Sequence, residues 1–186
     1  MRKLLALSVA LVALAGCEHW HKMTGQSEAA KAPPPPAPVV DTIADEANIK
    51  ALTDQYVADV NARNIDAIMS HYASDVFVFD AVPPRQYVGA DAYRKDWEGL
   101  LGQFKSLKFE LSDLSVASDG QVAWGHSIQR LSGTVQMGKK AQKFDVTVRV
   151  TDVFKKIGSD WKIVQEHVSV PVDLSHGAKA DLSSKP

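Results

Sequence analysis

Apolar side chains recur three or four residues apart in the segment that follows residue 41, and this spacing predicts three helices. The first helix carries Tyr56 on its apolar face, so the phenol of Tyr56 is expected to point inward. Asn64 is a suitable cap for a short second helix, and the strand VFVFD that follows it ends in Asp80. Asp91 is placed to cap the third helix. The apolar positions that define these helices are Ile49, Leu52, Tyr56 and Val60; Ile68, Met69 and Tyr72; and Tyr93, Trp97, Leu100, Leu101 and Phe104.

The second half of the chain has the pattern of β-strands joined by short turns. Short connections make successive strands antiparallel neighbours, and three helices would then cover one face of the sheet. The segment AVPPRQY, which follows Asp80 and contains Pro83 and Pro84, is expected to form a loop instead. We therefore predict an α+β fold in which a curved antiparallel sheet wraps around three N-terminal helices. The predicted strands cover residues 107–116, 121–135, 140–155 and 161–170.

The N-terminus has the layout of a bacterial export signal. Arg2 and Lys3 precede an apolar run, residues 4–14, that is too short to span a bilayer. The sequence LAGC follows and resembles the lipobox of bacterial lipoproteins, which implies cleavage before Cys17 and lipidation of that cysteine. Glu18 after the cysteine is similar to the signal for sorting to the outer membrane, with the domain facing the periplasm. An ordinary secretory signal with an incidental cysteine is the alternative.

The segment between the export signal and the first helix has no apolar periodicity. It contains the run Pro33 to Pro36, which favours an extended, flexible tether. The predicted organisation is a lipoprotein signal peptide at 1–16, a Pro-rich tether at 17–40, one folded domain at 41–173 and a disordered tail at 174–186.

Composition narrows the classes of partner and cofactor. The 186 residues are 45% hydrophobic, which is enough for one domain with a substantial core. A formal net charge of -1, from 21 basic and 22 acidic side chains without a basic cluster, argues against a nucleic-acid partner. The single cysteine excludes an internal disulfide. A metal site built from His71, His126 and His167 is not expected, because no pair has the spacing of metal ligands, and no cofactor is indicated.

One predicted strand, Phe144 to Phe154, carries a carboxyl group on an otherwise apolar face. Its even positions are valine or phenylalanine apart from Asp152. If this face looks into the domain, burial raises the pKa of Asp152, and the neutral carboxyl can donate a hydrogen bond. The alternatives are that a bulge or the end of the strand brings Asp152 to water, or that an arginine pairs with it.

Several aromatic residues and histidines are candidates for contact with a ligand, with a plain core role as the alternative. His126 shares a strand face with Trp124, so it either enters a pocket or takes a core or edge position. His167 lies on a strand whose two faces are equally mixed, so its direction is open. The candidate ligand-binding residues are Phe79, Trp97, Trp124, His126, Phe154 and His167.

Two segments resemble the SnoaL-like and ketosteroid isomerase proteins of the nuclear-transport-factor-like superfamily. The first, Tyr56 to Gly89, reads YVADVNARNIDAIMSHYASDVFVFDAVPPRQYVG, and the second, Thr151 to Ser169, reads TDVFKKIGSDWKIVQEHVS. The resemblance implies a cone-shaped fold with an internal pocket. For an isomerase it also implies that Asp80 moves a proton, while Tyr56 and a protonated Asp152 stabilise the enolate oxygen of the substrate.

Three functions are compatible with these observations. The leading hypothesis is a bacterial cell-envelope lipoprotein whose SnoaL-like domain binds a small, mostly apolar organic molecule in a central pocket. The second is an acid-base enzyme of the ketosteroid isomerase type that uses Tyr56, Asp80 and Asp152 as catalytic residues. The third is a structural or assembly module with a vestigial pocket, which forms a homodimer through the outer face of the sheet.

Overall fold

The computed structural model describes residues 42–175, 177 and 179–181. The predicted signal peptide, the lipidation site Cys17, the tether and the last residues of the predicted tail lie outside this part of the chain. None of the described helices is long and apolar enough to cross a membrane. The elements, in chain order, are α1 (Thr42–Asn61), α2 (Ile65–Ser70), β1 (Tyr72–Phe79), β2 (Tyr87–Val88), α3 (Ala90–Gly102), β3 (Phe104–Ser118), β4 (Val122–Met137), β5 (Lys140–Ile157), β6 (Asp160–Ser169), β7 (Val172–Asp173) and β8 (Lys179–Ala180).

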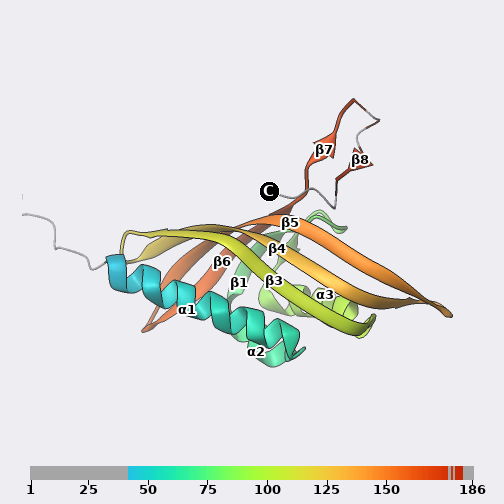
Figure 1. Ribbon diagram of the computed structural model, residues 1–186. Helices are drawn as coiled ribbons and strands as arrows, with labels where there is room; N and C mark the ends of the chain where they lie inside the picture. The colour runs from blue at the N-terminus through green and yellow to red at the C-terminus, as the bar shows by residue number, and fades with distance from the viewer. Residues whose placement is uncertain (1–41, 176, 178, 182–186) are drawn as a thin grey trace, which may run out of the picture. The chain divides into compact units, whose positions relative to one another are not determined.

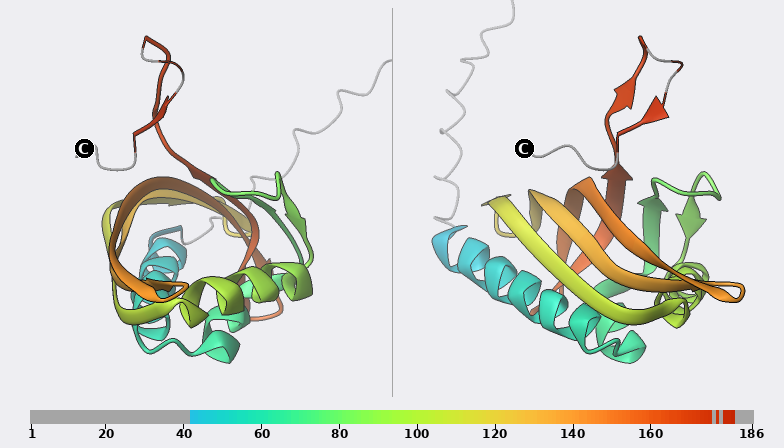
Figure 2. Two further views of the ribbon diagram at one scale, coloured as in Figure 1. Left: turned by 90° about the vertical axis from the view of Figure 1, so that its right-hand side faces the viewer. Right: turned by 45° about the vertical axis from the view of Figure 1, so that its right-hand side comes forward.

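Six strands form one sheet, in the order β2-β1-β6-β5-β4-β3, and β7 pairs with β8 in a separate small sheet. β3 to β6 follow one another as antiparallel neighbours joined by short turns, as the pattern predicts. Figures 1 and 2 show the large sheet curling around α1, with α3 also on its concave side. The predicted α+β class, with a curved sheet wrapped around helices, is confirmed.

One strand pair is parallel, which the prediction of an antiparallel sheet did not include. β1 lies beside β6 and runs in the same direction, with Phe79 opposite His167. The reason is the long connection after β1. The chain passes through β2 and α3 to the far edge of the sheet at β3, then returns strand by strand to β6. A connection of this length removes the constraint that keeps hairpin strands antiparallel.

The two N-terminal helix caps in the described residues differ in kind. Asn64 caps α2 as predicted, because its side chain accepts a hydrogen bond from the amide of Ala67 at 3.1 Å. The cap of α3 is Gly89 rather than the predicted Asp91. Gly89 has a φ of 85°, in the left-handed region that glycine adopts without steric cost. The turn into α3 is therefore set by backbone freedom and not by a capping carboxyl.

Three strand residues were predicted to lie in helices or in a loop. Tyr72 and Phe104 begin β1 and β3 instead of ending the second and third helices. Tyr87, in the predicted loop, belongs to β2 and lies opposite Val78 of β1. Single apolar residues at an element boundary satisfy either pattern, so their assignment depends on tertiary pairing.

A β-bulge in β6 decides which side chains face the interior. Two consecutive residues of β5 lie opposite Ile163 and Gln165, so Val164 is an extra residue in β6. An extra residue reverses the alternation of side chains from that point on. Ile163 is buried before the bulge, and Glu166 is buried after it with 3% of its surface exposed. His167 consequently points outward and is exposed.

The core lies on the concave side of the sheet. On β5 the even positions face it, and Val150 and Phe154 are each only 2% exposed. On β4 the odd positions face it instead, including the buried residues Ala123 and Ser127. The buried cluster is completed from the helices and from β1, β3 and β6, chiefly by Ile49, Val60, Ile68, Val76, Val78, Phe109, Trp161 and Ile163.

Candidate functional site

A cavity of about 530 Å³ is bounded by α3, by β4 to β6 and by the loop after β1. Most of its wall is apolar, as in typical binding sites for small organic molecules. The apolar lining consists of Ala81, Val82, Trp97, Gly99, Leu100, Phe109, Leu131, Phe144, Val146, Val148, Val168 and Val170. The polar lining consists of Tyr56, Asp80, Tyr93, Lys95, Asp96, Gln103, Gln129 and Glu166.

The carboxyl group of Glu166 is the centre of a buried hydrogen-bond network at this cavity. Its Oε2 accepts a hydrogen bond from the hydroxyl of Tyr72 at 2.8 Å, and its Oε1 accepts one from the hydroxyl of Tyr93 at 2.5 Å. The hydroxyl of Tyr56 lies 2.9 Å from that of Tyr72. Because the single hydroxyl proton of Tyr72 goes to Glu166, Tyr56 must be the donor to Tyr72. We call these four residues the phenol-carboxyl cluster.

Four separate elements supply the phenol-carboxyl cluster. Tyr56 comes from α1, Tyr72 from the start of β1, Tyr93 from α3 and Glu166 from β6 after its bulge. The rings of Tyr72 and Tyr93 meet edge to face at 5.3 Å between centroids, and those of Tyr56 and Tyr72 at 6.1 Å. Edge-to-face packing fixes the ring planes and so aims the hydroxyl groups.

Burial sets the protonation of the cluster. Desolvation raises the pKa of Glu166 above its ordinary value, and the hydrogen bonds from Tyr93 and Tyr72 work in the opposite direction. Desolvation, followed by the nearby charge of Glu166, holds the pKa of the Tyr72 and Tyr93 phenols well above their usual range. The phenols therefore keep their protons and donate them to the carboxyl group.

Asp152 forms a carboxyl pair with Glu166. The two residues lie opposite each other on β5 and β6. Desolvation, and then the charge of Glu166, raise the pKa of Asp152 well above its ordinary value. Among the described residues, Oδ1 of Asp152 is buried without a hydrogen-bond partner, whereas both oxygens of Glu166 accept phenol protons. Hydrogen bonds therefore stabilise a negative charge better on Glu166 than on Asp152. We place the proton of the pair on Asp152.

Asp80 lines the same cavity from the loop after β1. Its Oδ1 accepts a hydrogen bond from the amide of Val82 at 3.3 Å. Desolvation raises the pKa of Asp80, with a further contribution from the charge of Asp96. Asp96, on α3, also lines the cavity and accepts a hydrogen bond from the hydroxyl of Tyr87 at 2.6 Å. The cavity thus contains three carboxyl groups from three different parts of the chain.

Comparison with known proteins identifies the family. The sequence profile of the SnoaL-like domain matches residues 49–173. The chain belongs to the SnoaL-like domain family. An NTF2-like protein of unknown function from Pseudomonas putida KT2440 is 30% identical, with a TM-score of 0.69 over 78% of this chain and 99% of that one. A ketosteroid isomerase-like protein from Erwinia carotovora atroseptica SCRI1043 is 16% identical, with a TM-score of 0.56 over 67% of this chain and 95% of that one, and shares the fold. The search of curated proteins returned no match.

The SnoaL-like domain brings only part of the predicted catalytic set to its cavity. Tyr56 and Asp80 both line it. Asp152 is absent from the described cavity lining and faces a small adjoining void, together with Phe154 and Glu166. Glu166 borders both spaces and so takes the position at the cavity that the sequence assigned to Asp152. The chemical roles of these residues stay predictions.

Of the predicted ligand-binding residues, Trp97 lines the cavity of the SnoaL-like domain and Phe154 lines the adjoining void. The indole Nε1 of Trp97 is buried and has no hydrogen-bond partner within the described part of the chain. A buried donor without a partner is costly in a folded protein. Trp97 therefore retains an unused hydrogen-bond donor beside the cavity.

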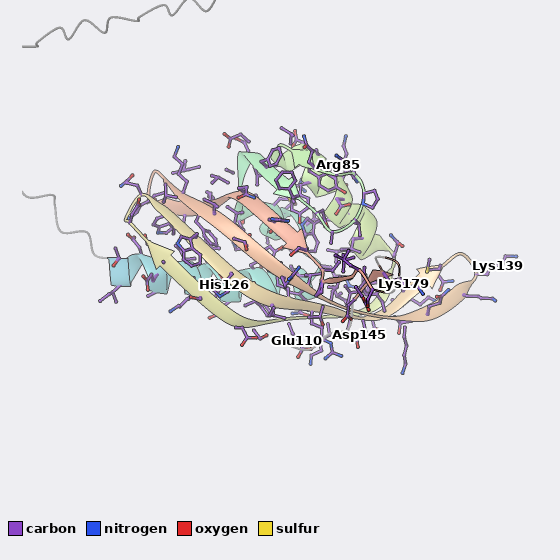
Figure 3. The ribbon with its side chains drawn as sticks, turned by 90° about the horizontal axis from the view of Figure 1, so that it is seen from above. Arg85, Glu110, His126, Lys139, Asp145 and Lys179 are labelled. Atoms are coloured by element: carbon purple, nitrogen blue, oxygen red, sulfur yellow. The ribbon has the colours of Figure 1, made fainter. Side chains whose placement is uncertain are left out.

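The other four predicted ligand-binding residues lie on the outer face of the sheet, and the prediction that they line the pocket needs correction. Trp124 and His126 occupy even positions of β4, whose odd positions face inward. His167 follows the bulge in β6, and Phe79 lies opposite it on β1. The rings of Trp124 and His126 stack at 5.8 Å, and those of Phe79 and His167 meet at 5.6 Å. Figure 3 labels His126 on β4.

Glu166 of the SnoaL-like domain was not selected from the sequence, because strict alternation over the whole strand leaves its direction undecided. A signal exists in the last residues of the strand. Glu166, Val168 and Val170 share two-residue spacing, and all three line the cavity. Alternation traced from Val170 and Val168, at the apolar end of the strand, back towards its start places Glu166 on the same face. A metal role is not supported in residues 42–181 as described, since no three His, Cys, Asp or Glu side chains form a possible metal site.

Proposed function

We propose that this SnoaL-like domain binds a small, mostly apolar organic molecule in the cavity. The observation that carries the proposal is a cavity of about 530 Å³ with an apolar wall and a polar cluster at Glu166. Contact with the wall supplies most of the binding free energy, because apolar surface leaves water on both partners. The few polar groups orient the molecule. The 30% identical Pseudomonas protein is of unknown function, so the ligand class rests on the geometry of this chain.

The test is to fill the cavity without removing a polar group. Leu131→Trp adds a large side chain to the cavity wall, and Thr151→Trp adds the same side chain at an exposed position of the outer face. A ligand at one hundred times its Kd stabilises the wild type by about 2.7 kcal/mol. We expect a panel of small aromatic compounds, 1-naphthylmethanol included, to raise Tm by several degrees in the wild type and in Thr151→Trp. Leu131→Trp should lose the response. If no compound stabilises the wild type, or if both variants respond alike, the proposal is wrong.

We propose in addition that the protein is an envelope lipoprotein. The support is the LAGC sequence after a short apolar run, which places Cys17 at the cleavage position. Lipidation of Cys17 would hold the domain at the outer membrane, facing the periplasm, through the tether. Cys17→Ser should move the protein from the membrane fraction to the soluble periplasmic fraction of a bacterial host. Retention of the variant in the membrane fraction would contradict the anchor.

A second candidate function is acid-base catalysis, because Asp80 and Glu166 line one cavity and the pKa of each is raised by burial. In this function Asp80 moves the proton and Glu166 replaces Asp152 as the second carboxyl group. Asp80→Asn should then abolish turnover of a β,γ-unsaturated ketone while leaving the affinity for that compound within a few fold of the wild type. Absence of turnover by the wild type would rule out this isomerase activity without affecting the binding proposal.

A further inference from the structure

The phenol-carboxyl cluster offers acceptors rather than donors to a ligand. Tyr56 and Tyr93 line the cavity, but the proton of Tyr93 goes to Glu166 and the proton of Tyr56 goes to Tyr72. A phenol hydroxyl has one proton and two lone pairs, so each of these oxygens has only its lone pairs left for a ligand. An oxygen anion or carbonyl group at this position would find no free phenol donor.

Glu166 itself adds to the acceptors. Each of its oxygens accepts one phenol proton, and a carboxylate has room for about four hydrogen bonds in all. Its neighbour Asp152 lies opposite on β5, so a shared proton leaves one negative charge on the pair. This charge is 3% exposed at the residue that carries it. A ligand that fills the cavity displaces the remaining water from the charged carboxyl group. The ligand must then replace the hydration that this group has lost.

Most of the charged groups that line the cavity are carboxyl groups. The carboxyl groups of Asp80, Asp96 and Glu166 line it, against the single amine of Lys95, which belongs to an exposed residue on α3. Gln103 and Gln129 add neutral amides, and Trp97 adds one buried donor. The described lining thus combines an apolar wall with an excess of negative charge and of acceptors.

We propose that the ligand is an apolar molecule with a protonated amine, bound with the ammonium group at Glu166 and the apolar part against the valine-rich wall. An ammonium group has three N–H donors and no acceptor, which complements the lone pairs of Tyr56, Tyr93 and Glu166. The positive charge of the ammonium group also compensates the negative charge of Glu166 when water leaves the cavity. An alcohol supplies one donor but no charge, and a carboxylate ligand supplies no donor and a negative charge, so both should bind more weakly. The inference deepens the proposed binding function and rests on it.

The experiment compares three molecules of nearly the same shape: 1-naphthylmethylamine, 1-naphthylmethanol and 1-naphthoate. Isothermal titration calorimetry at pH 7 measures the Kd of each for the full-length protein. We expect the amine to bind roughly tenfold or more tighter than the alcohol, since hydrogen bonds to charged groups are stronger than neutral ones, and the carboxylate to bind weakest. If the alcohol or the carboxylate binds best, the amine inference is wrong and the binding function stands. If none of the three binds and the broad panel also fails, both are wrong.

Variants assign the preference to Glu166. Glu166→Gln removes the charge and should bring the amine and the alcohol within a factor of about three of each other. Glu98→Gln removes the same charge from an exposed position on α3 and should keep the wild-type ratio. A folded Glu166→Gln that keeps the full preference for the amine overturns the assignment. If this variant does not fold, Asp80→Asn carries the test, because loss of a cavity carboxylate should weaken the amine a few fold and leave the alcohol unchanged.

Discussion

The two faces of the large sheet carry adjacent rows of residues with opposite environments. Each row crosses four strands, and the two rows are only one residue apart along each strand. The inner row faces the core and contains both carboxyl groups of the pair, whereas the outer row contains two exposed histidines. The inner row is Val78, Glu166, Asp152 and Gly125, and the outer row is Phe79, His167, Thr151 and His126.

The difference between the rows shows that environment decides which group has unusual chemistry. Histidine titrates near neutral pH and is the usual candidate for acid-base work, but His126 and His167 are exposed and contact only neighbouring aromatic rings in the described contacts. On the inner row, desolvation raises the pKa of Asp152 and of Glu166. A one-residue change of register would exchange the two sets of side chains.

A one-residue shift of β6 beyond its bulge should have the largest effect. Insertion of one alanine between Gln165 and Glu166 would place the alanine opposite Asp152, so Glu166 would turn outward and His167 inward. We expect a loss of about 4 kcal/mol or more in the free energy of unfolding, because the insertion buries an unpaired histidine and leaves two phenols without their acceptor. Urea denaturation measures the loss. Val164→Ala keeps the register and should cost only about 1 kcal/mol. Equal losses in both variants would show that register is not the cause.

Tyr72→Phe should have the next largest effect. The substitution removes one of the two donors to Glu166 and the only described acceptor of the Tyr56 hydroxyl. Two buried polar groups lose partners, so we expect a loss of about 2 to 3 kcal/mol. Thr151→Val is the matched change on the outer row and should alter stability by less than about 0.5 kcal/mol. The comparison between the faces fails if Thr151→Val costs as much as Tyr72→Phe.

Asp152→Asn should change the dependence of stability on pH. Desolvation, and then Glu166, raise the pKa of Asp152, so the folded chain holds this proton more strongly than the unfolded chain. That contribution to stability is complete below the ordinary pKa of an aspartate and is lost as the pH rises through the raised pKa. Asparagine does not ionise, so the variant should gain Tm relative to the wild type as the pH rises above the ordinary pKa of an aspartate.

The outer-face control for this pH experiment is Asp145→Asn. Hydrogen bonds from Arg130 lower the pKa of Asp145, so its contribution is present above the ordinary pKa of an aspartate and is lost only as the pH falls. The Tm of Asp145→Asn should therefore follow the wild type with a constant offset over the same range. Parallel curves for Asp152→Asn and the wild type would contradict the buried, protonated state of Asp152.

Trp124→Glu should have the smallest effect on the isolated domain. Trp124 is 49% exposed on the outer face, so a charge there should change stability by less than about 0.5 kcal/mol. Homodimerisation through this face remains a prediction, and the same variant tests it. Sedimentation velocity should show the wild type as a dimer and Trp124→Glu as a monomer, because an interface excludes an unpaired charge. A monomeric wild type would rule out the dimer.

The sequence predicted the parts of this fold in which the pattern is long and uninterrupted. The even positions of β5 from Phe144 to Phe154 are apolar apart from Asp152, so alternation places Asp152 on the face that would meet a core. On β4 the same reasoning failed, because Gly125 lies opposite Asp152 and against Phe154. A side chain at Gly125 would come within 3.2 Å of the carbonyl oxygen of Ser115. Close packing thus favours small residues on the inner face of β4 and leaves Trp124 on the outer face. The larger apolar side chain is therefore on the exposed face, the opposite of what alternation of apolar and polar residues indicates.

The candidate site was less predictable than the fold for a related reason. Tyr56 and Asp80 lie at the cavity because they follow from the apolar face of α1 and from the end of β1. Glu166 depends on a single extra residue in β6, and no local composition marks Val164 as the bulge. The donor direction of Tyr56 depends in turn on Tyr72 and Glu166, so it follows only from the assembled network.

The phenol-carboxyl cluster also imposes an order on the assembly of the binding site. Its phenols all precede residue 94, whereas its carboxyl group belongs to the last strand of the large sheet, 73 residues beyond Tyr93 and 94 beyond Tyr72. A chain synthesised only as far as β5 contains every donor and lacks their acceptor. Contacts this distant in sequence form late in folding, since the intervening loop must close first. The cavity therefore acquires its polar end only when β6 is in place, and ligand binding reports a completely folded chain.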